Sequence, residues 1–216
     1  RSMLDYRFRR LAPARRAARR EGHAGAMFPW QSGSDGREET QTLHLNPRSG
    51  RWLADNSRLQ RHIDIAVAHN AWSYYQVTGD VEFLRFRGAP MIIEVARFLA
   101  GLATYDDELD RYEITGVMGP DEYHDGYPGS DVPGLDNNAY TNVMTVWVVC
   151  RVLEILDLLP DHHARELWDQ LGVTTQELDH WDDVSRQMRV CFHDDGVISQ
   201  FEGYDRLQEL DWLDYE

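Results

Sequence analysis

Three carboxylates, one histidine and two tyrosines lie within residues 119–127 (GPDEYHDGY). A carboxyl group between proline and aromatic residues loses hydration, and this raises its pKa towards the range in which it can act as a general acid. Glu122 is therefore our candidate proton donor. The alternative is that Asp121 and Glu122 only cap the structure that follows or bind its backbone.

A second group of chemistry-bearing residues lies at positions 27–40 (MFPWQSGSDGREET). Phe28 and Trp30 offer flat faces to a sugar ring, and polar residues such as Glu39 can hydrogen-bond hydroxyl groups in fixed directions. A carbohydrate is the ligand that this composition indicates. Ordinary packing of a tryptophan against a turn explains the same residues equally well, so both interpretations stay open.

His124 follows the candidate acid by two residues, where it can position a sugar hydroxyl or orient the acid. A single histidine is also commonly a structural residue whose partners are its neighbours, and this alternative stays open. Neither an H-E-x-x-H motif nor paired cysteines accompany it, so we expect no metal ion.

The composition limits the classes to which the chain can belong. With 216 residues and a hydrophobic share of 42%, residues 1–216 can fold as one domain, and disorder is not expected. A net charge of −15 argues against nucleic acid or an anionic membrane as a partner, because both require clustered positive charge. All 22 basic residues are arginine, which leaves no lysine for a Schiff base or a phosphate-binding P-loop.

Cys150 and Cys191 are each flanked by apolar residues, which is typical of buried free thiols. No apolar run approaches the ~20 residues of a membrane span, and no leader-like segment opens the chain. We therefore expect a cytoplasmic protein without a membrane partner. The chain begins at Arg1 in place of an initiator methionine, which suggests a piece of a longer protein.

The elements that must position these side chains are mostly helical, since apolar residues recur at three- and four-residue intervals. Helices are expected at residues 4–20, 59–77, 81–102, 137–156, 162–171 and 174–191. Pro13 interrupts the first helix or begins its second half, and the arginines there fit a solvated face better than a polyanion site. A long loop is expected at 31–57, a short strand at 112–115 and an irregular stretch from residue 196 onward.

The helix that starts at Asn137 is apolar on nearly every side, and such a helix is normally buried among neighbours. This favours a ring of helical hairpins, whose loops collect the site at one side, over a plain helical bundle. The predicted fold class is therefore all-α. Asn137 and Asn138 could cap this helix or reach the site beside Glu122.

Several segments resemble glycoside hydrolase family 65. They are GAMFPWQSGSDGREET, DIAVAHNAWSYYQVTGD followed by EVARF, and TGVMGPDEYH followed by LDNNAYTNVM. The family includes maltose, kojibiose and trehalose phosphorylases, and the resemblance covers nearly the whole chain in order. It implies an (α/α)6-barrel catalytic domain, of which residues 1–216 would form about half.

The same resemblance implies roles for particular residues. Glu122 occupies the position of the family's general acid in the GPDEYH motif, and Trp30, in the FPW motif, would line the sugar pocket. We place the other substrate contacts at Phe28, Glu39, Tyr123, His124 and Asn138.

The implied reaction is inverting phosphorolysis of an α-glucosyl disaccharide of the trehalose, maltose or kojibiose type. The disaccharide and inorganic phosphate would be the partners, no cofactor is expected, and a homodimer is an assembly to test. An inverting hydrolase would use water in place of phosphate, and a non-catalytic carbohydrate-binding fragment is a third hypothesis. The family's later Lys-Gln pair and phosphate-binding loop have no counterpart here, so no phosphate site is located.

Residues 44–62 (HLNPRSGRWLADNSRLQRH) look like an insertion relative to the family's phosphorylases. Arg48, Arg51 and Trp52 could shape the acceptor side of the pocket, and a solvated surface loop explains them at least as well.

Overall fold

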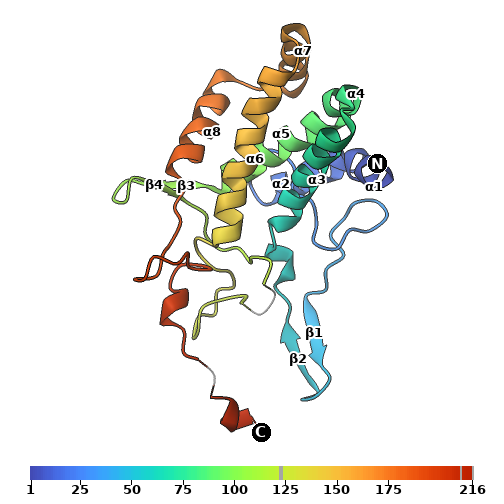
Figure 1. Ribbon diagram of the computed structural model, residues 1–216. Coiled ribbons are helices and arrows are strands. Elements are labelled where there is room, and N and C mark those ends of the chain that lie inside the picture. The colour runs from blue at the N-terminus through green and yellow to red at the C-terminus, as the bar shows by residue number, and fades with distance from the viewer. Residues whose placement is uncertain (122–123, 210, 216) are drawn as a thin grey trace.

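The computed structural model describes residues 1–121, 124–209 and 211–215, and it is mostly helical (Figure 1). The α-helices are α1 (Ser2–Arg9), α2 (Leu11–Arg20), α3 (His62–Thr78), α4 (Val81–Phe83), α5 (Ala89–Leu102), α6 (Ala139–Leu158), α7 (Asp161–Leu171) and α8 (Thr175–Gln187). The strands are β1 (Leu43–Asn46), β2 (Arg51–Ala54), β3 (Thr104–Asp106) and β4 (Arg111–Glu113). Short 3₁₀ turns lie at Ser57–Leu59, Tyr204–Arg206 and Trp212–Tyr215.

Every helix that the apolar periodicity predicts is present, with shifted ends. The stretch 4–20 is two helices that meet at Arg10. Pro13 lies in the first turn of α2, where a backbone N–H has no partner within the helix. Arg16, Arg19 and Arg20 of α2 are exposed, as expected for a solvated face, whereas Arg15 is partly buried and its Nε lies 2.9 Å from the buried Glu94 of α5.

The other helix boundaries also differ from the expected ones for local reasons. The predicted helix 81–102 contains a π-helical segment, Leu84–Gly88, between α4 and α5. The last helix ends before residue 191 because Met188 is extended and pairs with Tyr112 beside β4.

The core lies where α3, α5, α6 and α8 pack against one another (Figure 1). α5 is the most buried of these helices and is apolar along nearly its whole length. Trp72 of α3, Phe98 of α5 and Trp181 of α8 are among the largest side chains that are fully buried there. Burying such aromatic side chains stabilises the fold by about 1.5–3 kcal/mol each.

α6 differs from the expectation that it is buried on every side. Its buried face carries Asn142, Val149 and Ile155, whereas Tyr140 and Val143 are 42% and 45% exposed. α3, α5 and α8 cover one side of α6 and leave the other side open. By length and composition alone α6 could cross a membrane, contrary to our expectation, but the core helix of a folded domain passes the same test.

The predicted long loop at 31–57 contains a β-hairpin that the sequence analysis missed. β1 pairs with β2 in antiparallel register, and the hairpin extends away from the helices (Figure 1). Its turn contains Gly50 at φ +68°, a backbone conformation that glycine adopts without strain. The predicted strand at 112–115 is present as β4, which is displaced by about one residue and pairs with β3.

The two cysteines are free thiols, as expected, but neither is buried. Cys150 and Cys191 are both partly exposed, because Cys150 lies towards the open side of α6 and Cys191 lies in a loop. Partial burial raises the pKa of the Cys191 thiol.

Candidate active site

We name residues 119–127 the acid segment, and its described residues, 119–121 and 124–127, lie between β4 and α6 at the loop end of the helices (Figure 1). Glu122 and Tyr123, the predicted proton donor and a predicted substrate contact, lie outside the described residues. The segment enters beside the residues before α3: the Met118 N–H donates to the Leu59 carbonyl over 3.1 Å. Met118 also pairs with Gln60, so the acid segment begins against the start of α3.

Gly119 packs directly on the start of α6. A Cβ at this position would lie 2.2 Å from Asn138 Nδ2, so no other residue fits without moving Asn138. Asn138 is the N-cap of α6: its Oδ1 accepts from the Thr141 N–H over 3.0 Å, and its Nδ2 donates to the Gln200 carbonyl over 3.3 Å. The capping role is confirmed, whereas contact between Asn138 and substrate stays a prediction.

His124 is held by a carboxylate and by aromatic rings. Its Nδ1 lies 2.8 Å from Asp121 Oδ2, and its ring centroid lies 5.3 Å from that of Phe201 and 5.8 Å from that of Tyr204. The side chain is 33% exposed. His124 is therefore tied to the residue that precedes the candidate acid, and it keeps a solvent-accessible part that can meet a ligand.

Trp30 belongs to a row of rings beside the acid segment. Its ring meets that of His62 edge to face at 5.3 Å, and His62 meets Tyr140 at 6.5 Å. The row therefore joins the FPW loop to the first turns of α3 and α6. Burial lowers the pKa of His62, so its imidazole is neutral near pH 7 and can act as a donor or an acceptor.

The FPW loop is anchored at Phe28 and held at Glu38. Phe28 is buried, and its N–H donates to Asp64 Oδ1 over 2.6 Å. The Trp30 N–H donates to Glu38 Oε2 over 3.0 Å. Phe28 therefore lies in the core in this structure, and a direct contact between Phe28 and a sugar stays a prediction.

Glu39 lies on the exposed side of the same loop, with 54% of its side chain accessible. Its N–H donates to the Gln31 carbonyl over 2.8 Å, and its carboxylate lies 3.9 Å from Arg37. This carboxylate is accessible to a ligand hydroxyl, and its role in binding stays a prediction.

Sequence reasoning missed several residues that surround the site. Both side-chain polar atoms of Gln60 and Nδ1 of His62 are buried without a hydrogen-bond partner in the part of the chain that the structure describes. Gln200 donates to Asp121 from the stretch that was expected to be irregular. Only their position at the start of α3, with Gln60 just before it and His62 as its first residue, could have indicated these two residues, and nothing in the pattern indicated Gln200.

Metal ligands do not gather in the described ranges, where no three His, Cys, Asp or Glu side chains are close enough to hold an ion. The exposed arginines of the β1–β2 hairpin, Arg48 and Arg51, lie on the solvent side with Trp52, which is 65% exposed. In this structure the hairpin is thus a solvated surface element.

The amino-acid sequence that forms this site matches a known protein family. The model of the Glycosyl hydrolase family 65 central catalytic domain matches residues 1–216, and the chain belongs to this family. The resemblance that the motifs indicated is confirmed. Since the match covers residues 1–216, the ring row of Trp30, His62 and Tyr140 and the acid segment lie within the family's catalytic domain.

The chain is also similar in sequence to individual proteins. The chain is 64% identical over 215 residues to an uncharacterized glycosyl hydrolase of Mycobacterium tuberculosis, of which it spans 16%. It is 39% identical over its whole length to trehalose 6-phosphate phosphorylase of Lactococcus lactis and 36% identical over 94% of its length to kojibiose phosphorylase of Caldanaerobacter subterraneus. It spans 26% of each of these two enzymes.

A solved structure shows the same fold. A putative kojibiose phosphorylase from the human microbiome superposes with a TM-score of 0.81 over 99% of this chain and 28% of its own, at 22% identity. The chain therefore corresponds to between 16% and 28% of the length of these relatives.

Proposed function

We propose that residues 1–216 form about half of an (α/α)6-barrel catalytic domain whose enzyme carries out inverting phosphorolysis of an α-glucosyl disaccharide. The observation that carries this proposal is the family match over the whole chain, which includes the acid segment. Relatives at 36–39% identity are named as phosphorylases, and this supports phosphate over water as the attacking group.

In the proposed reaction, Glu122 is the general acid. A phosphate oxygen attacks the anomeric carbon from the face opposite to the glycosidic bond, and the bond between that carbon and the bridging oxygen breaks. The bridging oxygen takes the proton of Glu122 and leaves as a hydroxyl of the free sugar. The products are the second sugar and a sugar 1-phosphate of inverted configuration.

The ring row gives this reaction a sugar-binding surface. Trp30 would stack on the sugar, and the neutral imidazole of His62 would hydrogen-bond a hydroxyl. Glu39, Tyr123, His124 and Asn138 are the further substrate contacts that we propose, with Phe28 supporting the loop from the core. No cofactor takes part, and phosphate is a co-substrate whose donors would come from the rest of the enzyme.

The test measures sugar 1-phosphate and free glucose released by the longest polypeptide that contains these residues. Trehalose, trehalose 6-phosphate, maltose and kojibiose are each supplied with and without inorganic phosphate. Phosphate-dependent release of sugar 1-phosphate from one of them is the expected result. Release of glucose without phosphate would contradict the proposed reaction and would indicate a hydrolase.

Glu122→Gln is the matching variant, because the amide keeps the shape of the side chain and cannot donate the proton. We expect kcat to fall by about 10²- to 10⁴-fold while sugar binding is kept. Glu82→Gln is the control, since Glu82 is an exposed residue of α4 away from the site. Near-normal turnover of Glu122→Gln would show that another group is the acid.

A further inference from the structure

The stretch that follows α8 makes the contacts that hold the acid segment. We name residues 199–204 the C-terminal brace. Gln200 Nε2 donates to Asp121 Oδ2 over 2.9 Å, and the same oxygen lies 2.8 Å from His124 Nδ1. The rings of Phe201 and Tyr204 pack against the His124 ring. One residue before and one residue after the pair 122–123 are thus held by the brace.

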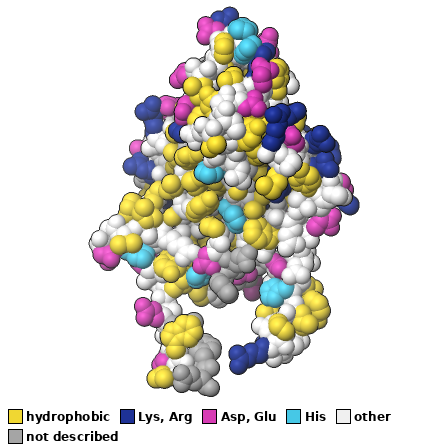
Figure 2. All heavy atoms as spheres, turned by 45° about the vertical axis from the view of Figure 1, so that its right-hand side comes forward, with side chains coloured by type: hydrophobic (Ala, Val, Ile, Leu, Met, Phe, Trp, Pro, Cys, Tyr) yellow, Lys and Arg dark blue, Asp and Glu magenta, His cyan; other side chains and the backbone are white. Residues whose placement is uncertain are grey.

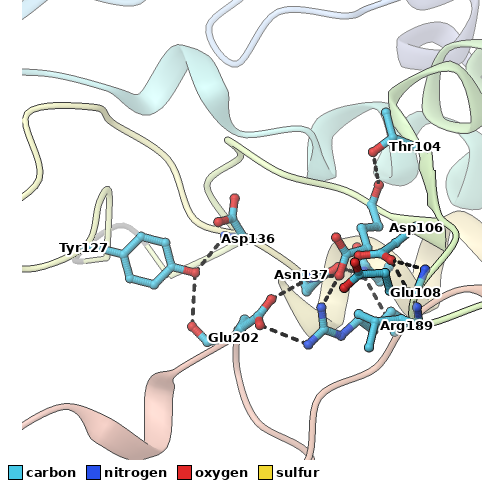
Figure 3. Close-up of polar contacts among 11 residues, drawn as sticks. Thr104, Asp106, Glu108, Tyr127, Asp136, Asn137, Arg189 and Glu202 are labelled. Carbon is cyan, nitrogen blue, oxygen red and sulfur yellow. Dashed lines mark hydrogen bonds and ion pairs between the residues drawn. The ribbon is translucent and has the colours of Figure 1, made fainter. Parts of the chain in front are cut away.

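A second contact lies further along the acid segment. The Tyr127 hydroxyl donates to the Glu202 carbonyl over 3.0 Å and accepts from the Asp136 N–H over 3.1 Å (Figure 3). The ring of Tyr127 also lies 6.1 Å from that of Phe201. The segment is therefore fixed to the brace at Asp121, at His124 and at Tyr127.

The brace is itself fixed to the start of α6. The Gln200 carbonyl accepts from the Ala139 N–H over 2.9 Å, and the Glu202 N–H donates to the Asp136 carbonyl over 3.0 Å. Phe201 is 1% exposed, so the middle of the brace is anchored in the interior. Movement of the brace would therefore disturb the N-terminal end of a core helix.

A charged network adds to this anchoring. Arg189 binds Glu113 of β4 and reaches Glu202 over 2.9 Å, and Asn137 donates to Glu202 over 2.9 Å (Figure 3). Asn137 has φ +52°, a left-handed conformation that asparagine tolerates better than most residues. Its side chain is buried and donates hydrogen bonds to the carboxylates of this network. The network joins β4, the start of α6 and the brace into one unit.

We propose that Gln200 is a positioning residue, which rests on the proposed function: its amide holds Asp121 so that the next residue, Glu122, presents its proton to the glycosidic oxygen. Two hydrogen bonds to one carboxylate oxygen fix the position and direction of Asp121. Transition-state geometry is sensitive to such support, since a displacement of about 1 Å can cost about 10²-fold in rate.

Gln200→Glu tests this proposal, because the near-isosteric carboxylate cannot donate to Asp121 and repels it. For the disaccharide we expect kcat to fall by about 10- to 100-fold with KM nearly unchanged, as for a group that acts in the transition state. For α-glucosyl fluoride with phosphate we expect a small effect, because fluoride leaves with little help from an acid. Equal losses on both substrates, or no loss, would overturn the proposal.

Gln187→Glu is the matched control. Gln187 Nε2 also donates to an aspartate, Asp110 Oδ1, over 3.2 Å, but it does so at the end of α8 away from the acid segment. We expect near-normal kcat for this control. If Gln200→Glu does not fold, Gln200→Met serves in its place, because it removes the hydrogen-bond donor without adding charge. We expect the same difference between the disaccharide and α-glucosyl fluoride. If the two substrates are affected equally, the proposal is overturned.

Amide hydrogen exchange separates this inference from the proposed function. In the same polypeptide, Gln200→Glu should speed exchange at residues 124–127, while Gln187→Glu should not. If exchange is faster in Gln200→Glu but the unmodified enzyme releases no sugar 1-phosphate, the contact between the brace and the acid segment is supported. The proposed function, and with it the role of Gln200 in catalysis, is then refuted. Unchanged exchange would refute the brace.

Discussion

Asp64 is a residue at which burial and hydrogen bonding oppose each other. Its side chain is fully buried, and this burial raises its pKa to about 7. The N–H of Phe28 donates to Oδ1, and the positive charges of Arg61 and Arg7 also favour the ionised form, but they offset the desolvation only in part. Near neutral pH the carboxyl group that anchors the FPW loop therefore exists in both protonation states.

A pH dependence of stability follows from this shift. Because the pKa of Asp64 is higher in the folded than in the unfolded state, the folded protein binds more protons between pH ~4 and ~7, and its unfolding free energy falls as the pH rises across that window. Asp64→Asn should remove this contribution, which is at most about 4 kcal/mol. Denaturant unfolding at pH 5, 6 and 8 measures it, with Asp107→Asn on the surface as control. An unchanged pH slope in Asp64→Asn would contradict the assignment.

At the scale of single residues, the sequence indicates candidate site residues that lie close together along the chain. Residues whose partners lie far away along the chain were missed. Glu122 and His124 stand out because several ionisable side chains are close in the chain. Asp64 and Gln200 bind partners that are 36 and 79 positions away, and no local pattern contains such a pair. Capping was one of the two roles considered for Asn138, and it is confirmed; such a role can be recognised because capping depends on only a few neighbouring residues.

At the scale of elements, Gly119 of the acid segment packs against the start of α6. Gly119→Ala would bring a Cβ to 2.2 Å from Asn138 Nδ2 and force the cap to move. We expect a loss of about 1 kcal/mol or more in unfolding free energy, as for a lost N-cap. Gly101→Ala in α5 is the control, because the nearest atom to the added Cβ, His23 Nδ1, would lie at 3.9 Å, an ordinary contact.

A double-mutant cycle sharpens this prediction. If the clash acts through Asn138, then Gly119→Ala should cost less in an Asn138→Ala background than alone, because the opposing side chain is gone. Strict additivity of the two changes in thermal or denaturant unfolding would contradict a direct contact between these positions.

The elements themselves were predictable to different degrees. Long helices such as α3, α5 and α6 follow from apolar periodicity, which is a local property of the sequence. The β1–β2 hairpin was missed because its strands are short, exposed and surrounded by turn-forming residues. The open side of α6 was missed because periodicity records how apolar a face is, and the neighbours that cover it are decided by the whole fold.

At the scale of the whole molecule, apolar side chains are exposed beside α1 and α3. Hydrophobic side chains are spread over the face shown in Figure 2, and Met3 and Val77 are 82% and 87% exposed. Both line a cavity of about 840 Å³ between α1 and α3. Contiguous exposed apolar surface commonly marks a place where another part of a protein or a partner packs, and we place the continuation of the proposed half-barrel here as a prediction.

Val77→Ser provides a test of the half-barrel proposal. In the longest polypeptide it should lower the unfolding free energy by about 1–3 kcal/mol, because the valine would be covered there. In residues 1–216 alone it should have little effect on stability and reduce the binding of a hydrophobic dye. Equal effects in the two polypeptides would contradict the proposal that this face is covered.

The brace also orders events in time. Gln200 is 79 positions after Asp121, so a growing polypeptide contains the acid segment well before the residue that fixes it. At a synthesis rate of about 5–20 residues per second, the delay is roughly 4 to 16 seconds. During translation the helices up to α6 can pack first, and Asp121, His124 and Tyr127 of the acid segment can make their contacts with the brace only after the brace has left the ribosome.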